Sequence, residues 1–130
     1  MLKLIAISSI AAIFFASPAL ADDTNQHFVP IDSPDLTAAI CNAQAHNKKL
    51  APLVAKESHT VEDLLEIHEI TYTLENALMR IEKDLEKMKN DLEEIHLGSE
   101  SMKADRISKF GAEYLSAVNL LLNGVECSKK

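Results

Sequence analysis

A hexapeptide that ends in histidine occurs twice in this chain. Residues 63–68 read Asp-Leu-Leu-Glu-Ile-His, and residues 91–96 read Asp-Leu-Glu-Glu-Ile-His. The offset is 28 residues, or four heptads, so both histidines share one phase on a continuous helix. Imidazole and carboxylate groups spaced three or four positions apart lie on one helical face, where they can bind a transition metal. The repeat therefore raises the question of a metal site.

The second copy offers the better ligand set, because Glu93 and Glu100 flank His96 at i−3 and i+4. The Glu93-x-x-His96 spacing is that of ferritin-like di-metal bundles, but position 65 is Leu, so a second such pair is absent. His68 and His96 would also lie about 42 Å apart on one helix and could not share an ion.

Three interpretations of these histidines are open. The first is a divalent transition metal held by Glu93, His96 and Glu100, or by His68, Tyr72 and Glu75. The second is non-covalent haem b, since His and Met side chains are available in a helical bundle. The third, which we favour, is that the histidines are boundary residues bonding to neighbouring helices. No cofactor is then expected.

Little else in the chain indicates catalysis. Cys41 and Cys127 are not part of a C-x-x-C or C-x-x-C-H motif, which excludes a thioredoxin-like redox site and covalent c-type haem. No Ser-His-Asp or Cys-His arrangement indicates a hydrolase. We therefore expect a protein that is not an enzyme.

The N-terminus predicts export. Lys3 precedes an apolar run from Leu4 to Phe15, and Ala19-Leu20-Ala21 has the small-x-small form of a cleavage site. We expect residues 1–21 to be a signal peptide, 22–32 a flexible leader and 33–127 a helical bundle domain. The expected location is the periplasm, with secretion as the alternative.

The charge balance excludes two classes of partner. Without Lys3 the chain has 12 basic and 20 acidic residues, a net charge of −8 (12 − 20). Binding to nucleic acid or to an anionic membrane surface relies on basic patches. We expect no nucleic acid, and no membrane association after signal cleavage.

Three helical segments follow the leader. The first begins with Ser33 as N-cap and Pro34 at the first helical position, and Pro52 should kink it or end it near Leu50. The third should run from about Ser101 to Asn123, with Gly124 ending it. Its inward residues are expected to be Ile107, Phe110, Tyr114, Leu115, Val118, Leu121 and Leu122.

The second segment predicts one long helix with a coiled-coil-like seam. Thr60 and Asp63 resemble a capping box, and Gly98 is the expected C-terminal cap. We expect continuity across Asn90, where a break is the alternative. The pairs Arg80–Asp84, Lys87–Asp91 and Lys89–Glu93 are expected on its exposed outer side. The apolar seam alternates steps of three and four through Leu64, Ile67, Thr71, Leu74, Leu78, Ile81, Leu85, Met88, Leu92 and Ile95.

These segments predict an all-α fold, a three-helix antiparallel bundle with one long central helix. In that arrangement Cys41 and Cys127 differ in height along the long helix by roughly 10 Å, a gap that the chain after Gly124 can cover. An intramolecular disulfide is therefore expected, with free thiols or an intermolecular bridge as the alternatives.

The segments 68–78 and 92–100 resemble a family of small exported helical proteins of proteobacteria. That family has a similar H-E-x-T-Y-x-L-E-x-A-L … L-E-E-x-H-x-x-S-E pattern and no assigned function. The resemblance covers roughly residues 34 to 100, and it implies a periplasmic location without indicating an activity.

Function is then predicted from exposure of the seam. The long helix should extend past its shorter neighbours, so that part of its apolar seam stays uncovered. Such strips usually mark association. We expect an interaction or structural module with a protein partner or self-association through the long helix. The alternative is a metal- or haem-binding bundle.

Overall fold

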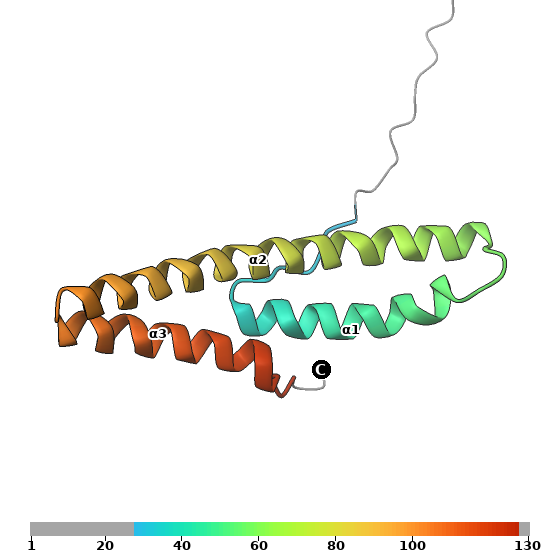
Figure 1. Ribbon diagram of the computed structural model, residues 1–130. Helices are drawn as coiled ribbons and strands as arrows, with labels where there is room; N and C mark the ends of the chain where they lie inside the picture. The colour runs from blue at the N-terminus through green and yellow to red at the C-terminus, as the bar shows by residue number, and fades with distance from the viewer. Residues whose placement is uncertain (1–27, 128–130) are drawn as a thin grey trace, which may run out of the picture.

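A computed structural model describes residues 28–127 as three α-helices joined by short turns. These are α1 (Leu36–Val54), α2 (Val61–Glu100) and α3 (Ala104–Asn123). Both short helices run antiparallel to α2, as Figure 1 shows. The predicted all-α three-helix architecture with a long central helix is confirmed. The expected signal peptide and residues 22–27 lie outside the described residues.

The two short helices lie end to end along α2. Figure 1 shows α1 along one half of α2 and α3 along the other half, with their ends meeting near the middle. Most cross-sections of the molecule therefore contain only two helices, which limits how much apolar surface can be buried. Among the described residues, the largest fully buried side chain is that of Thr73.

The long helix α2 is continuous through Asn90, as the unbroken seam predicts. Its capping box is also confirmed, because Thr60 Oγ1 accepts from the Asp63 N–H at 3.2 Å and Asp63 Oδ2 accepts from the Thr60 N–H at 3.1 Å. Its predicted end at Gly98 is wrong, since the helix continues to Glu100. Gly98 is buried against α3, where an added Cβ would lie 3.0 Å from Ile107 Cγ1. Its lack of a side chain permits close helix packing.

The ends of α1 also differ from prediction. Asp35, not Ser33, is the N-cap, and its Oδ1 accepts from the Ala38 N–H at 2.8 Å. Ser33 is buried. The helix continues through Pro52 to Val54 instead of ending near Leu50. Pro52 lacks the N–H that would donate to the carbonyl four residues earlier, and only Leu53 and Val54 follow it in the helix.

The last helix begins at Ala104, three residues later than predicted. The turn before it contains Met102, whose φ of 54° lies in the left-handed region. As predicted, the helix ends before Gly124, whose φ is 82°.

The buried face of α2 is rotated by one position from the predicted seam. The line of contact with α1 and α3 contains one residue of each heptad, with Thr73 and Met88 buried beside it, and four of the ten expected seam residues are exposed. Small or acidic residues occupy much of the line because they allow the neighbouring helices to approach closely. The residues on this contact line are Asp63, Ile70, Ala77, Asp84, Asp91 and Gly98.

Part of the expected flexible leader is bound to the helices. The Ile31 N–H donates to Thr73 Oγ1 at 3.2 Å, and Asn76 Nδ2 donates to the Ile31 carbonyl at 3.0 Å. Asn42 Nδ2 on α1 donates to the Asp32 carbonyl at 3.0 Å. Residues 31 and 32 therefore belong to the folded domain.

The predicted disulfide is present between Cys41 and Cys127, whose Cα atoms are 5.5 Å apart. Cys41 lies in α1 and Cys127 follows α3, so the bond ties the two short helices together. Within residues 28–127, no helix is long and apolar enough to cross a membrane.

Candidate functional site

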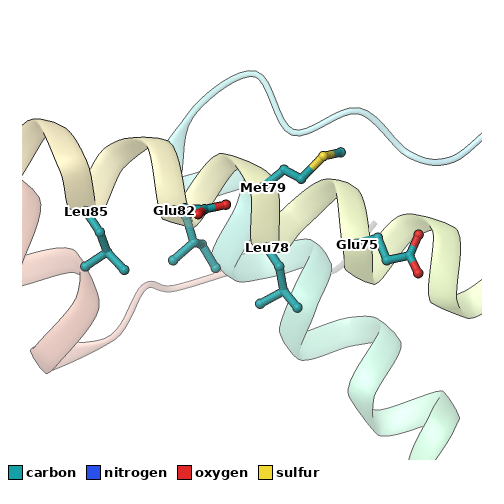
Figure 2. Close-up of a pocket in the computed structure, with 6 residues that line it drawn as sticks. Glu75, Leu78, Met79, Glu82 and Leu85 are labelled. Carbon is teal, nitrogen blue, oxygen red and sulfur yellow. The ribbon is translucent and has the colours of Figure 1, made fainter.

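One row of leucines on α2 is exposed to solvent. Leu64, Leu78, Leu85 and Leu92 are 55%, 59%, 49% and 45% exposed, respectively. They share one heptad phase, with Thr71 at the remaining position, and each follows a contact-line residue directly. We call these four residues the leucine face. In Figure 2, Leu78 and Leu85 point to the same side of α2.

The apolar surface continues onto α3. Leu115 and Leu122 are 63% and 78% exposed, and each follows by one position the heptad phase of Ile107, which packs on Gly98. In two right-handed helices that run antiparallel, the residue directly after a contact residue lies on the same side of the pair in both helices. Leu115 and Leu122 therefore lie on the same side as the leucine face.

The opposite side of the α2–α3 pair is charged. Lys87 Nζ lies 2.5 Å from Glu113 Oε2 and 2.8 Å from Asp91 Oδ2. Arg106 lies 2.6 Å from Glu94 Oε2. The hydrogen bond from Arg106 lowers the pKa of Glu94, and that from Lys87 lowers the pKa of Glu113. The hairpin thus has one ion-paired side and one apolar side.

The centre of the leucine face borders an open hollow of about 560 Å³ (Figure 2). Its lining residues lie near the middle of α2, the stretch beside which the ends of the two short helices meet in Figure 1. Carboxylates border its apolar floor. The lining residues are Glu75, Leu78, Met79, Ile81, Glu82 and Leu85.

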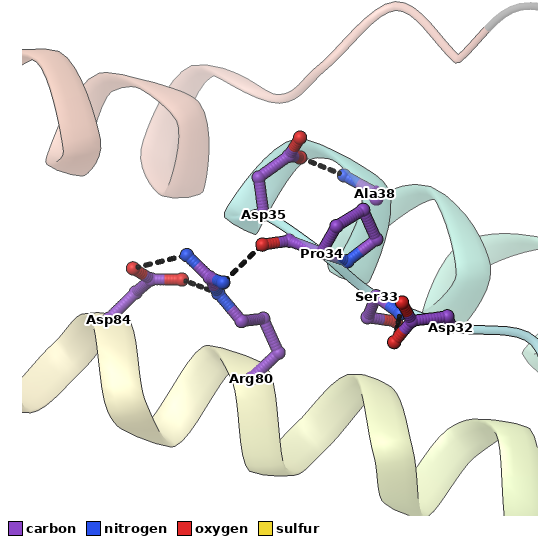
Figure 3. Close-up of polar contacts among 7 residues, drawn as sticks. All are labelled: Asp32, Ser33, Pro34, Asp35, Ala38, Arg80 and Asp84. Atoms are coloured by element: carbon purple, nitrogen blue, oxygen red, sulfur yellow. Dashed lines mark hydrogen bonds and ion pairs between the residues drawn. The ribbon is translucent and has the colours of Figure 1, made fainter.

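The other side of the same stretch of α2 carries a polar clamp, drawn in Figure 3. Arg80 Nε donates to Asp84 Oδ2 at 2.7 Å and Nη2 donates to Asp84 Oδ1 at 3.3 Å. Arg80 Nη1 donates to the carbonyl of Pro34, just before α1. The hydrogen bonds to Asp84 raise the pKa of Arg80. The clamp fixes the start of α1 against the middle of α2.

The predicted metal ligands are only partly brought together. His96 Nε2 lies 3.4 Å from Glu100 Oε1, and both side chains are exposed. In the part of the chain that the structure describes, no group of three or more His, Cys, Asp or Glu side chains is placed to hold a metal ion. The site of Glu93, His96 and Glu100 stays a prediction that metal analysis of the purified protein tests.

Among the residues that the structure describes, neither repeated histidine bonds to a neighbouring helix, contrary to our favoured interpretation. His68 packs edge-on against Tyr72 of its own helix, with ring centroids 4.8 Å apart. His96 likewise pairs with Glu100 of α2. Both histidines are exposed.

A larger hollow of about 1120 Å³ lies beside α1, the leader residues and Cys127. The histidine on its wall, His46, is buried, and its Nδ1 lies 2.9 Å from the Asn42 carbonyl. That bond is a local helix contact, so His46 has a structural role here.

The three ion pairs of α2 were predicted on its outer side, which is wrong for two of them. Arg80–Asp84 faces the start of α1, and Asp91 of the Lys87–Asp91 pair is buried beneath α3. The third pair is not formed, since Lys89 lies 3.4 Å from Glu86 instead of binding Glu93. The signal in the sequence that indicated the contact line was a set of short Asp side chains in strict heptad register with Gly98.

Comparisons with known proteins give one match. A family model described as "Family of unknown function (DUF6746)" matches residues 1–123. No curated protein and no solved structure matches the chain.

Proposed function

This chain belongs to the DUF6746 family of unknown function, and we propose that it is a non-enzymatic interaction module that binds a protein partner through its leucine face. The observation that carries the proposal is the exposure of four leucines in one heptad phase of α2. The match to this family does not indicate an activity.

The physical argument starts from the thin cross-section. Two paired helices can bury one line of residues each, but α2 carries apolar residues over a wider arc. Ile81 and Ile95 lie half-buried at the edge of the contact, and the leucine face lies beyond them. Burying apolar surface stabilises by about 25 cal/mol per Å², so covering this arc favours association.

We also propose that the protein acts in the periplasm. The disulfide between Cys41 and Cys127 supports an oxidising compartment, in which such bonds persist. The signal-peptide pattern of residues 1–21 supports export.

Photo-crosslinking in cells tests the proposed surface. A photoreactive amino acid replaces Leu85 in one variant and Lys83, an exposed residue two positions away, in the control. We expect a discrete covalent adduct from position 85 and a much weaker one from position 83. Absence of an adduct at 85, or equal adducts at both positions, contradicts the proposal.

A further inference from the structure

We propose that the partner covering the leucine face is a second copy of this chain, with the two α2 helices antiparallel about a two-fold axis near Glu82. This inference rests on the proposed function and names its partner. The surfaces of a two-fold dimer must be self-complementary, and a row of leucines packs against an identical row.

The structure of α3 supports a missing layer of helices. Although α3 has a regular apolar stripe, none of its residues is buried. Its exposed leucines lie on the same side as the leucine face. When two copies pair through α2 in antiparallel orientation, the α3 of one copy lies beside the α1 of the other. Each cross-section then contains four helices, the arrangement in which an apolar core can be enclosed.

The charges beside the leucine face favour the antiparallel orientation. One row of residues lies four positions after the leucine row, on its outer flank: His68, Glu75, Glu82, Lys89 and His96. Antiparallel pairing places this row against the same row of the other copy. Glu75 and Lys89 are each seven residues from Glu82, so each glutamate faces a lysine across the interface.

A parallel pair has the opposite consequence. In a parallel pair, the handedness of the helices places the charged row of one copy against a different row of the other copy. That row is half-buried, contains Ile81 and lies on the other flank of the leucines. Glu75 and Glu82 would then lose solvent without gaining a cation. The parallel arrangement is disfavoured for that reason.

The repeated hexapeptide fits this symmetry. His68 and His96 are each 14 residues from Glu82. A two-fold axis there places the His68 end of the row on one copy against the His96 end of the row on the other copy. Two similar ends give each copy the same set of neighbours. The two copies of the hexapeptide therefore give the two ends of the proposed interface similar surfaces.

The dimensions are adequate for a stable dimer. The leucine face from Leu64 to Leu92 spans about 42 Å, and a helix about 10 Å wide gives roughly 400 Å² per copy. Contact between α3 and the other copy's α1 adds a strip of similar size. The total of roughly 800 Å² per partner is the size of a standard specific interface.

One charge opposes the arrangement. Glu82 lies near the axis, so it faces Glu82 of the other copy. Like charges at such spacing weaken association. Removing this charge should strengthen an antiparallel dimer by about twofold in dissociation constant. The change Glu82→Gln is therefore expected to tighten association.

Charge exchange tests the same pairing in a second way. Glu75→Lys and Lys89→Glu each place like charges opposite one another and should each weaken the dimer. The double variant restores opposite charges and should recover the dimer. Failure of the double variant to recover it overturns the assigned pairing.

The decisive experiment is cross-linking of single-cysteine variants with a short bis-maleimide, to which the disulfide-bonded native cysteines do not react. Glu82→Cys should give a covalent dimer, whereas Leu92→Cys and the outward control Lys83→Cys should not. Preferential linking of Leu92→Cys establishes a parallel pair and overturns the inference, as does absence of a dimer from all three. A monomeric protein that still gives a heavier adduct at position 85 in cells overturns this inference and leaves the proposed function standing.

Discussion

Cys41 and Cys127 are covalently joined where the ends of α1 and α3 meet, with their Cα atoms 5.5 Å apart and a separation of 86 positions in sequence. The bond closes most of the folded chain into one loop. Because α1 and α3 otherwise pack mainly on different halves of α2, it unites two helical hairpins into one unit.

Loss of the disulfide should therefore be costly. The double variant Cys41→Ser/Cys127→Ser is expected to lower the free energy of unfolding by about 4 kcal/mol, because a loop of this length gains that much entropy when opened. Urea denaturation followed by circular dichroism measures the change. An unchanged midpoint contradicts the uniting role of the bond.

Two helical glycines should respond oppositely to enlargement. Gly98 has Ile107 Cγ1 3.0 Å from where its Cβ would lie, whereas Gly111 has nothing within 4 Å. Gly111→Ala should stabilise by about 0.5–1 kcal/mol through helix propensity. Gly98→Leu should destabilise by about 1–3 kcal/mol, because α3 must move away. Thermal unfolding of both variants checks this, and equal effects contradict the close packing.

The Arg80 clamp should contribute measurable stability. Arg80→Ala removes two hydrogen bonds to Asp84 and one to the Pro34 carbonyl, and is expected to lower the free energy of unfolding. Arg80→Lys should recover only part, since one ammonium group cannot bind both partners in the same geometry. Lys83→Ala serves as the exposed control, with a change of less than about 0.5 kcal/mol. A loss no larger than that of this control contradicts the clamp.

Acid should destabilise the start of α2. Hydrogen bonds from Lys56 Nζ and the Thr60 N–H lower the pKa of Asp63 below its ordinary value. A carboxyl group with a lowered folded-state pKa contributes stability above its unfolded pKa of about 3.9, and this is lost as the pH falls through the folded value. Melting temperatures between pH 7 and pH 2 should fall more steeply for the native chain than for Asp63→Asn. Parallel curves contradict this linkage.

Local patterns predicted the local features of this fold. The Thr60–Asp63 capping box, the continuity of α2 through Asn90 and the end of α3 before Gly124 all depend on residues close in sequence. The disulfide followed from helix lengths and antiparallel order. These features needed no knowledge of side-chain packing between helices.

Packing between helices decided what the sequence could not show. A leucine heptad and the Asp/Ala/Gly heptad beside it are adjacent on α2, and either can face a neighbour. The close approach at Gly98 selected the smaller residues and left Leu85 exposed. The Arg80–Pro34 contact joins residues 46 apart, so no local pattern revealed it. The histidine repeat suggested ligands, but only distances between side chains show which groups meet.

The central claim is that the leucine face is a surface through which two copies of this chain associate, and not part of the core. Sedimentation velocity of the native chain and of Leu78→Ser/Leu85→Ser, over a hundredfold range of concentration, tests it most directly. We expect the native chain to pass from monomer to dimer, while the double variant stays monomeric with unchanged helical circular dichroism. A native chain that is monomeric throughout, or a double variant that still dimerises, contradicts the account.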